Sequence, residues 1–382
     1  MGIPDSLHKS IESAITKAPG AYLGVVCLFA LIGYTLIILP PLLIISASSN
    51  IYENISTGGL INWLFALVWL FVLIISALIS YRASQIKLPP PTGLTVSEEK
   101  LPKIFNFVQE CQDNFTRPTI HRIIITTNYE LDIIKVPKFA LPVWSTNIMV
   151  IGLPVLLCHS PKHFECMLAR RIGQFSKKQN PINNWLYQLR EIWKQYALAY
   201  SKLKSPDSYF LKWIYEKYAS LYGLISIHAA RLDEINADTY AMELFINEDI
   251  RQMITADMTY QRFLEKHYWP AINKIAAIRT KPALTPYQNM AAAVKTNLKE
   301  EKLQSLINTA FKAEPDRKST TPAMLKRLEN IGHDTPALTE NTGDTAAVKY
   351  LGESQNSVIN LIDKLWLNDI LNKQRQAKKQ SA

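Results

Sequence analysis

Cysteine is scarce in this sequence. Its 382 residues include four cysteines, and no two of them form a Cys-x-x-Cys pair. Small secreted domains and zinc knuckles depend on denser or paired cysteine. The sequence therefore predicts neither a disulfide framework nor a zinc knuckle, and it favours a reducing compartment.

Acidic, basic and histidine side chains are absent from a long stretch near the N-terminus. No Asp, Glu, Lys, Arg or His lies between Lys17 and Glu53. A helix rises about 1.5 Å per residue, so the apolar residues 21–47 can cross a hydrocarbon core of roughly 30 Å. They predict a transmembrane helix, and Pro40 and Pro41 should kink it or end its regular part because proline cannot donate the helical hydrogen bond.

A second uncharged run covers residues 59–80. Together the two runs predict a transmembrane helical hairpin. A cleaved signal peptide fits the first run less well, because its apolar part exceeds the usual length of about 7–15 residues and no small-residue cleavage site is evident.

Basic residues flank this hairpin on one side. Lys9 and Lys17 precede the first run, Arg82 and Lys87 follow the second, and the loop 48–62 has no Lys or Arg. The positive-inside rule then predicts a two-pass protein of a bacterial-type inner membrane, with both termini and the main domain in the cytoplasm. This arrangement also accounts for the net charge of +10. No nucleic-acid-binding module is recognisable, so we expect the lipid bilayer and no nucleic acid as a partner.

The chain has enough apolar material for a substantial core, since 48% of its residues are hydrophobic and 19% are charged. After a Pro-rich linker, residues 98–115 predict an amphipathic helix, and β-branched runs at 121–126 and 148–151 predict strands. The expected fold class is mostly α (α+β), with two transmembrane helices followed by a helical domain with a small β-sheet. The expected divisions are 1–20, the hairpin 21–82, the linker 83–95, the main domain 96–355 and a C-terminal helix with a basic tail 356–382.

Residues 180–222 are rich in both aromatic and basic side chains. They predict a helical insertion of two helices broken at Ser205 and Pro206. One interpretation places this insertion at the membrane interface, where aromatic and cationic side chains gather. The other makes the aromatic side chains a core and the basic ones a solvated face. The sequence leaves both open.

Residues 160–175 predict a helix that Ser160 caps and Pro161 begins. A zinc-peptidase helix of the His-Glu-x-x-His type has two zinc-ligating histidines one turn apart and a glutamate that acts as general base. In the same frame this chain has Arg170 and Gln174 at the histidine positions and Arg171 at the glutamate position.

A later stretch, residues 219–246, predicts one long helix. It carries Glu234 and Asp238 one turn apart, so both carboxylates point the same way. Taken alone, they would be surface acids.

These signals in this order resemble the HtpX and CAAX-prenyl-protease family of membrane zinc metallopeptidases, which are gluzincins. Arg231, Glu234, Ala237 and Asp238 match the family's Ser-Arg-x-x-Glu-x-x-Ala-Asp pattern, except that its serine is Ala230. The resemblance implies a zincin-like domain in which the glutamate is the third zinc ligand and the aspartate supports a ligating histidine.

Three further stretches resemble the same family. Phe139 to Pro142 is similar to the family's Asn-Ala-Phe-Ala stretch, but lacks the asparagine. Thr320 to Pro322, followed by Arg327, is similar to its Thr-His-Pro and Arg element, but lacks the histidine. Residues 346–353 are similar to its Leu-Gly-Glu ending. The resemblance also implies an edge strand that holds an extended peptide by strand addition. The residues of that strand would be Ile148, Met149, Val150 and Ile151.

The changes at the ligand positions predict a loss of hydrolysis. A guanidinium can neither ligate zinc nor accept a proton from an attacking water. We expect Arg170 or Arg171 to form an ion pair with Glu234 and Asp238 instead, because unpaired buried carboxylates are strongly destabilising. The alternative leaves the arginines exposed at a helix end.

One rival metal site remains conceivable. Cys158, His159, His163 and Cys166 lie within nine residues of each other and include soft ligands. The strand-to-helix turn at Pro161 argues against their convergence, and we expect neither a metal nor another cofactor.

The sequence thus predicts an inactive, membrane-anchored metallopeptidase homologue that binds peptide or membrane-protein segments or regulates a partner. Two alternatives stay open. One is an active zinc metalloendopeptidase with unconventional ligands, and the other is a non-enzymatic membrane scaffold.

Overall fold

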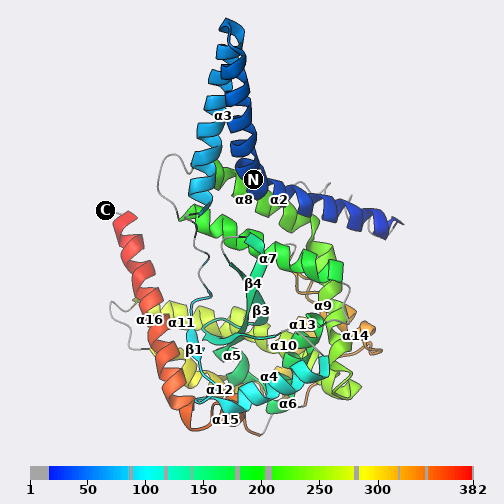
Figure 1. Ribbon diagram of the computed structural model, residues 1–382. Helices are drawn as coiled ribbons and strands as arrows, with labels where there is room; N and C mark the ends of the chain where they lie inside the picture. Colours follow the sequence, from blue (N-terminus) through cyan, green and yellow to red (C-terminus); the bar gives the residue numbers. More distant parts are fainter. Residues whose placement is uncertain are drawn as a thin grey trace. The chain divides into compact units, whose positions relative to one another are not determined.

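The computed structural model describes residues 17–84, 86, 88, 90–115, 119–138, 141–176, 181–202, 209–278, 284–316, 319–339 and 343–380. These residues form two compact units. Unit 1 comprises Met1–Pro89, Lys135–Thr146 and Trp185–Ala230, and unit 2 comprises Pro90–Ile134, Asn147–Asn184 and Arg231–Ala382. The fold is mostly helical with one small mixed sheet, as the sequence predicts (Figure 1).

Two long apolar helices open unit 1. They are α2 (Pro19–Thr57) and α3 (Leu60–Ser84), which lie side by side over part of their length. Both are long and apolar enough to cross a membrane, and their exposed surface is largely aliphatic. The predicted pair of apolar helices is therefore present, and α2 is continuous through Pro40 and Pro41.

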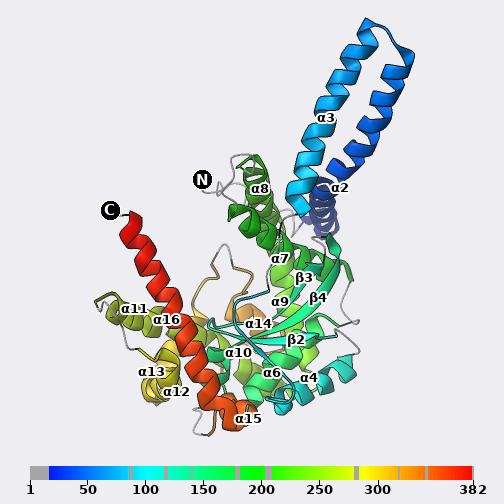
Figure 2. The ribbon, with the colours of Figure 1, turned by 60° about the vertical axis from the view of Figure 1, so that its left-hand side comes forward.

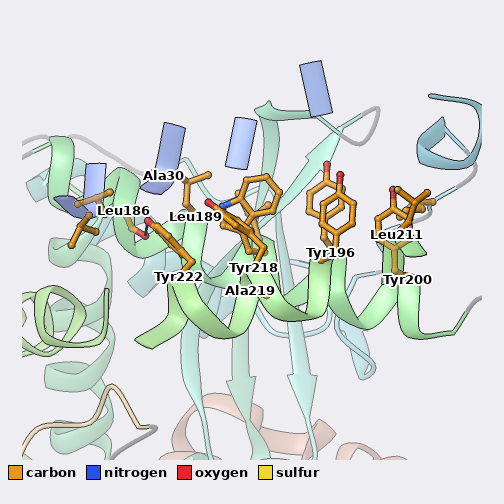
Figure 3. Packing of buried hydrophobic residues seen from close by; sticks show 14 residues of the cluster. Ala30, Leu186, Leu189, Tyr196, Tyr200, Leu211, Tyr218, Ala219 and Tyr222 are labelled. Atoms are coloured by element: carbon orange, nitrogen blue, oxygen red, sulfur yellow. Dashed lines mark hydrogen bonds between the residues drawn. The ribbon is translucent and has the colours of Figure 1, made fainter. Parts of the chain in front are cut away.

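The aromatic insertion forms two helices, as expected. They are α7 (Pro181–Ser201) and α8 (Tyr209–Ile225), and the predicted break at Ser205 and Pro206 lies outside the described residues. Most of its aromatic side chains form a buried cluster (Figure 3), although Tyr209, Phe210 and Trp213 are exposed. The core interpretation thus accounts for most of the aromatic side chains, which include Tyr187, Trp193, Tyr196, Tyr200, Tyr215, Tyr218 and Tyr222.

The prediction of one long helix at 219–246 is wrong. Helix α8 ends at Ile225, α9 (Ile227–Ala241) begins two residues later, and Ser226 interrupts them. The cause is a local competition for carbonyl groups. The guanidinium of Arg190 donates to the carbonyl of Gly223. The hydroxyl of Tyr22 donates to the carbonyl of Ile225 at 2.6 Å and accepts from the backbone N–H of Ala229 at 3.2 Å, so it takes the place of the helical hydrogen bond between them.

The sheet has the strand order β1-β2-β4-β3. Its strands are β1 (Leu94–Val96), β2 (Arg122–Thr126), β3 (Leu131–Lys138) and β4 (Leu141–Gly152). The predicted strands at 121–126 and 148–151 are confirmed as parts of β2 and β4, which pair in parallel with Ile123 opposite Met149. Strands β1 and β3 were not predicted from the sequence.

The proposed edge strand is an interior strand. Ile148, Met149, Val150 and Ile151 lie in β4, which has β2 on one side and β3 on the other, and all four are buried. Strand β4 is therefore not an edge of the sheet at these residues. The prediction that residues 148–151 form an edge strand is wrong, because β3 lies at that edge of the sheet, and their binding of peptide stays a prediction.

Helices make up the rest of unit 2 (Figure 2). Helix α6, the predicted helix at 160–175, packs against α4, α10 and α15. The helices are α4 (Pro102–Phe115), α5 (Leu153–Cys158), α6 (Pro161–Gln174), α10 (Asn247–Phe263), α11 (Trp269–Ile278), α12 (Pro286–Asn297), α13 (Glu300–Phe311), α14 (Met324–Asn330), α15 (Ala346–Leu351) and α16 (Gln355–Gln380), with a π-helix (Leu264–Tyr268) before α11 and a 3-10 turn (Gly352–Ser354) before α16.

Candidate functional site

Helix α6 begins and packs as its sequence dictates. The side chain of Ser160 accepts a hydrogen bond from the backbone N–H of His163 at 3.2 Å, which satisfies one of the free donors of the first turn. Its predicted apolar face is buried. The members of that face are Phe164, Met167, Leu168, Ile172 and Phe175.

Gly173 allows α6 to approach α9 closely. A Cβ at this position would come 2.5 Å from the Cβ of Tyr240 on α9, which no pair of side chains tolerates. The tight approach brings the residues of α6 that precede and follow Gly173 within reach of the acidic face of α9.

Arg170 lies between the two carboxylates of α9. Its Nε donates to Asp238 Oδ1 at 2.7 Å, and its Nη2 donates to Glu234 Oε2 at 2.6 Å and to the Glu234 carbonyl at 2.7 Å. All three side chains are buried. The ion pair expected from the sequence is confirmed, and the alternative of exposed arginines is wrong for Arg170.

Arg171 joins the same group from a second direction. Its Nη1 donates to Glu234 Oε1 at 2.8 Å and to the side-chain carbonyl of Gln174. Its Nε donates to the Leu131 carbonyl of β3 at 2.9 Å. Gln174 in turn donates to Asp233 Oδ2 at 2.9 Å. The three residues at the motif positions 170, 171 and 174 are thus tied into one hydrogen-bonded network.

Arg327 on α14 completes the arrangement. It is 2% exposed and contacts both oxygens of Asp238, with Nε 2.9 Å from Oδ2 and Nη2 2.8 Å from Oδ1. Its Nη1 lies 3.2 Å from Oδ2 of Asp257. The sequence places Arg327 in a motif but does not indicate its contact with Asp238, and no pattern in the sequence singles out Asp257.

We call Arg170, Arg171, Arg327, Glu234 and Asp238 the ion-pair cluster. Burial by itself would raise the pKa of Glu234, but Arg171 and Arg170 hold that pKa far below its usual range. Burial would likewise lower the pKa of Arg327, but Asp238 raises it above its ordinary value. Glu234 and Arg327 are therefore both charged at neutral pH.

A cavity of about 170 Å³ lies beside the cluster. Its walls carry the three guanidinium groups and the carboxylates of Glu234 and Asp257, and Thr321 and Pro322 also line it. The arginines cannot accept a proton or ligate a metal. Positions 170, 171 and 174 therefore offer neither a metal ligand set nor a general base of the His-Glu-x-x-His kind.

The outer edge of β3 beside this cavity is engaged by the protein itself. Arg171 donates to the carbonyl of Leu131, and the backbone N–H of Ile133 donates to its neighbour Asp132 Oδ1 at 2.7 Å. Along an antiparallel strand the backbone groups of successive residues face opposite sides. The carbonyl of Glu130 faces β4, where it accepts from the N–H of Gly152, so the carbonyl of Leu131 and the N–H of Ile133 face away from β4. Side chains thus take the positions where an added strand would bind.

In the part of the chain that the structure describes, Cys158, His159, His163 and Cys166 are not brought together as one ligand set. Among all the described residues, no three or more His, Cys, Asp or Glu side chains are grouped so that they could hold a metal ion. His159 is fully buried, and its Nε2 lies 2.6 Å from the hydroxyl of Tyr129. Burial raises the pKa of the Cys158 and Cys166 thiols, which opposes the thiolate that binds metals.

Arg231, another residue of the motif on α9, contacts a loop. Arg231 donates to the carbonyls of Ser319 at 3.0 Å and Asp316 at 2.6 Å, so it holds the loop before Thr321. Phe139 and Ala140 are outside the described residues.

A wider groove of about 990 Å³ is also found in unit 2. Trp269 and Trp366 stack in its wall with ring centroids 6.3 Å apart, and Tyr287 adds a third ring 5.5 Å from Trp269. The π-helix Leu264–Tyr268 lies directly before Trp269. Such π-helical turns are uncommon and frequently occur at functional sites.

No protein-family model matches the chain, and neither a curated protein nor a solved structure matches it.

Proposed function

We propose that this protein is a membrane-anchored, non-hydrolytic homologue of the HtpX-like zinc metallopeptidases. The observation that supports this proposal is the ion-pair cluster. Arg170 lies between Glu234, the acid that such an enzyme would use to bind zinc, and Asp238, the acid that would support a zinc-ligating histidine. A fixed guanidinium there supplies the positive charge that the metal would otherwise supply.

The test is direct. Protein purified without chelator should contain less than one zinc per ten chains by elemental analysis, and it should leave unfolded casein uncleaved both with and without a chelator. A stoichiometric metal together with chelator-sensitive cleavage would favour the active-enzyme alternative. A chelator-insensitive cleavage that Glu234→Gln abolishes would also contradict the proposal.

The non-hydrolytic role that we propose is binding of unfolded polypeptide or of a membrane-protein segment. Because side chains cap the outer edge of β3, we propose that this binding occurs in the wide groove lined by Trp269 and Trp366. Its volume and its aromatic wall suit the apolar side chains of an unfolded segment.

A photo-crosslinking amino acid at Asn273, in the groove, should capture fluorescein-labelled unfolded casein, and an excess of unlabelled casein should compete. The matched control places the same group at Asn308, which is exposed on α13. Equal capture at both positions would reject the groove as the binding surface.

We further propose that the hairpin spans a bacterial-type inner membrane with both termini and unit 2 in the cytoplasm. The support is the distribution of Lys17 and Arg82 on one side of the hairpin and the absence of Lys and Arg from the loop 48–62. Protease added to sealed inverted vesicles should digest unit 2, and protease added to intact spheroplasts should not.

A further inference from the structure

Helix α2 consists of two arms with different neighbours. Side chains between Tyr22 and Ile37 pack against the aromatic cluster of α7 and α8, whereas the later part runs beside α3, where Ala47 and Ala66 are buried. Figures 1 and 2 show the two arms running in different directions. Pro40 and Pro41 lie between them and explain the bend.

The first arm, residues 19–39, is fixed to the aromatic cluster by specific contacts. The hydroxyl of Tyr218 donates to the Phe29 carbonyl at 2.6 Å, and the hydroxyl of Tyr22 donates to the Ile225 carbonyl at 2.6 Å. Gly33 lies against the rings of Trp193 and Tyr218, where a Cβ would collide with both. Ala30 and its aromatic neighbours are drawn in Figure 3.

The opposite face of the first arm is exposed and apolar. Its exposed side chains include Leu28 at 58%, Leu31 at 55% and Leu39 at 51%. The sequence places no Asp, Glu, Lys, Arg or His between Lys17 and Glu53, so this face lacks the charge that a water-exposed helix carries. Val25, Ile32 and Ile38 complete the exposed apolar stripe.

The length of α2 also argues against a single straight crossing. Its 39 residues would extend about 58 Å, whereas a hydrocarbon core is about 30 Å thick. Helix α3 has 25 residues, or about 37 Å, which is close to the length needed for one crossing.

We propose that the first arm lies in the plane of the bilayer at the boundary between headgroups and acyl chains, with its outer leucine face on lipid. Only the second arm and α3 then cross the membrane. Lipid is the occupant because the arm continues without a break into the apolar hairpin, so a bilayer that covers the hairpin reaches the arm as well. This inference rests on the membrane anchoring proposed above.

The experiment measures the depth of nitroxide spin labels in lipid vesicles that hold the full chain. Cys27 is the one half-buried cysteine, and Cys111, Cys158 and Cys166 are buried. A background with Cys27→Ser, Cys111→Ala, Cys158→Ala and Cys166→Ala therefore receives one cysteine at a time, by Leu28→Cys, Leu31→Cys, Leu39→Cys or Ile45→Cys. Accessibility to oxygen and to a nickel chelate gives each depth. Phe71→Cys on α3 reports insertion of the hairpin, and the exposed Ser305→Cys on α13 is the aqueous control.

The labels at 28, 31 and 39 should share one shallow depth, and the label at 45 should lie deeper. A transmembrane first arm would instead change depth by about 16 Å between 28 and 39 and would overturn the proposal. Nickel accessibility at 28 equal to that at 305 would overturn it too, by placing the arm in water. Spin coupling between two copies, removed by dilution with unlabelled protein, would overturn it by showing that protein and not lipid covers the face.

The label at 71 separates this inference from the anchoring on which it rests. If that label is water-accessible, the membrane anchoring itself fails. If it is inserted and the arm labels are not at one depth, the in-plane arm alone fails.

Discussion

The Nε of Arg170 lies 2.7 Å from Oδ1 of Asp238, and the aspartate is completely buried. A buried aspartate is stable only when its charge is paired and its lone pairs are hydrogen-bonded. Arg327 contacts the same carboxylate from α14. Two arginines from distant parts of the chain therefore share one buried acid, and the two helices that carry them are held to α9 through it.

Removing one partner of this cluster should strongly destabilise unit 2. We expect Glu234→Gln to lower the free energy of unfolding by about 3–5 kcal/mol, because Arg170 and Arg171 would lose their shared anion in a buried site. Glu248→Gln is the matched control, since its side chain is 45% exposed and pairs with Arg251 within one helix, where a loss of at most about 1 kcal/mol is expected. Denaturant unfolding in detergent compares the two, and equal losses would contradict the prediction.

Restoring the zinc motif should create a metal site. In the triple variant Arg170→His, Arg171→Glu and Gln174→His, two imidazoles would lie one turn apart on α6, the first at the position that contacts Glu234 and the second at the position that contacts Asp233. We expect one zinc per chain by elemental analysis, and a rise in the unfolding temperature when zinc is added. The single variant Arg171→Glu, which lacks both histidines, should bind none, and a triple variant that stays free of zinc would argue against the proposed relationship.

Stability should fall as the pH drops from about 6.5 towards 4. Burial lowers the pKa of His163 to about 4, with Asp249 opposing this shift, so the unfolded chain binds a proton in this interval that the folded chain does not. Each pH unit then costs up to about 1.4 kcal/mol for this group, and His159, whose pKa burial also lowers, adds to the loss. Unfolding temperatures from pH 7.5 to 4.5 measure the slope, which His163→Gln should reduce; an unchanged slope would assign the pH dependence elsewhere.

The two glycines of the first arm should respond differently to substitution. Gly33→Leu should separate the arm from the aromatic cluster, because even a Cβ there collides with Trp193 and Tyr218. Gly24→Leu is the control, since a Cβ added at that position would meet no atom within 4 Å and leucine favours a helix. We expect limited proteolysis to cut α7 and α8 faster in the Gly33 variant only.

Local patterns in the sequence predicted most of the helices of the site. Ser160, Pro161 and the apolar face of α6 act within one helix, so their effect does not depend on the rest of the chain. The pairing of Arg170 with Glu234 and Asp238 was predicted as well, although these residues are more than sixty positions apart, because a familiar motif order supplied the tertiary relationship.

Relationships without such a pattern were missed. Arg327 reaches Asp238 across 89 positions, and no spacing in the sequence signals that contact. The edge strand was misassigned because β3, a mixed run of Leu131, Asp132 and Lys135, has no alternation that marks it as a strand. The interruption at Ser226 depends on Arg190 and Tyr22, which belong to other helices.

Residue identity and helical spacing are enough to locate the apolar helices, to show that α6 lacks zinc ligands, and to set two acids one turn apart. They could not show that Arg327 shares Asp238, which strand forms the edge of the sheet, or that α2 bends so that its first arm packs on α7 and α8. Those outcomes depend on packing and charge pairing between segments that are far apart in the chain. The energies of these contacts depend on the tertiary structure that brings the segments together, and local sequence patterns do not contain them.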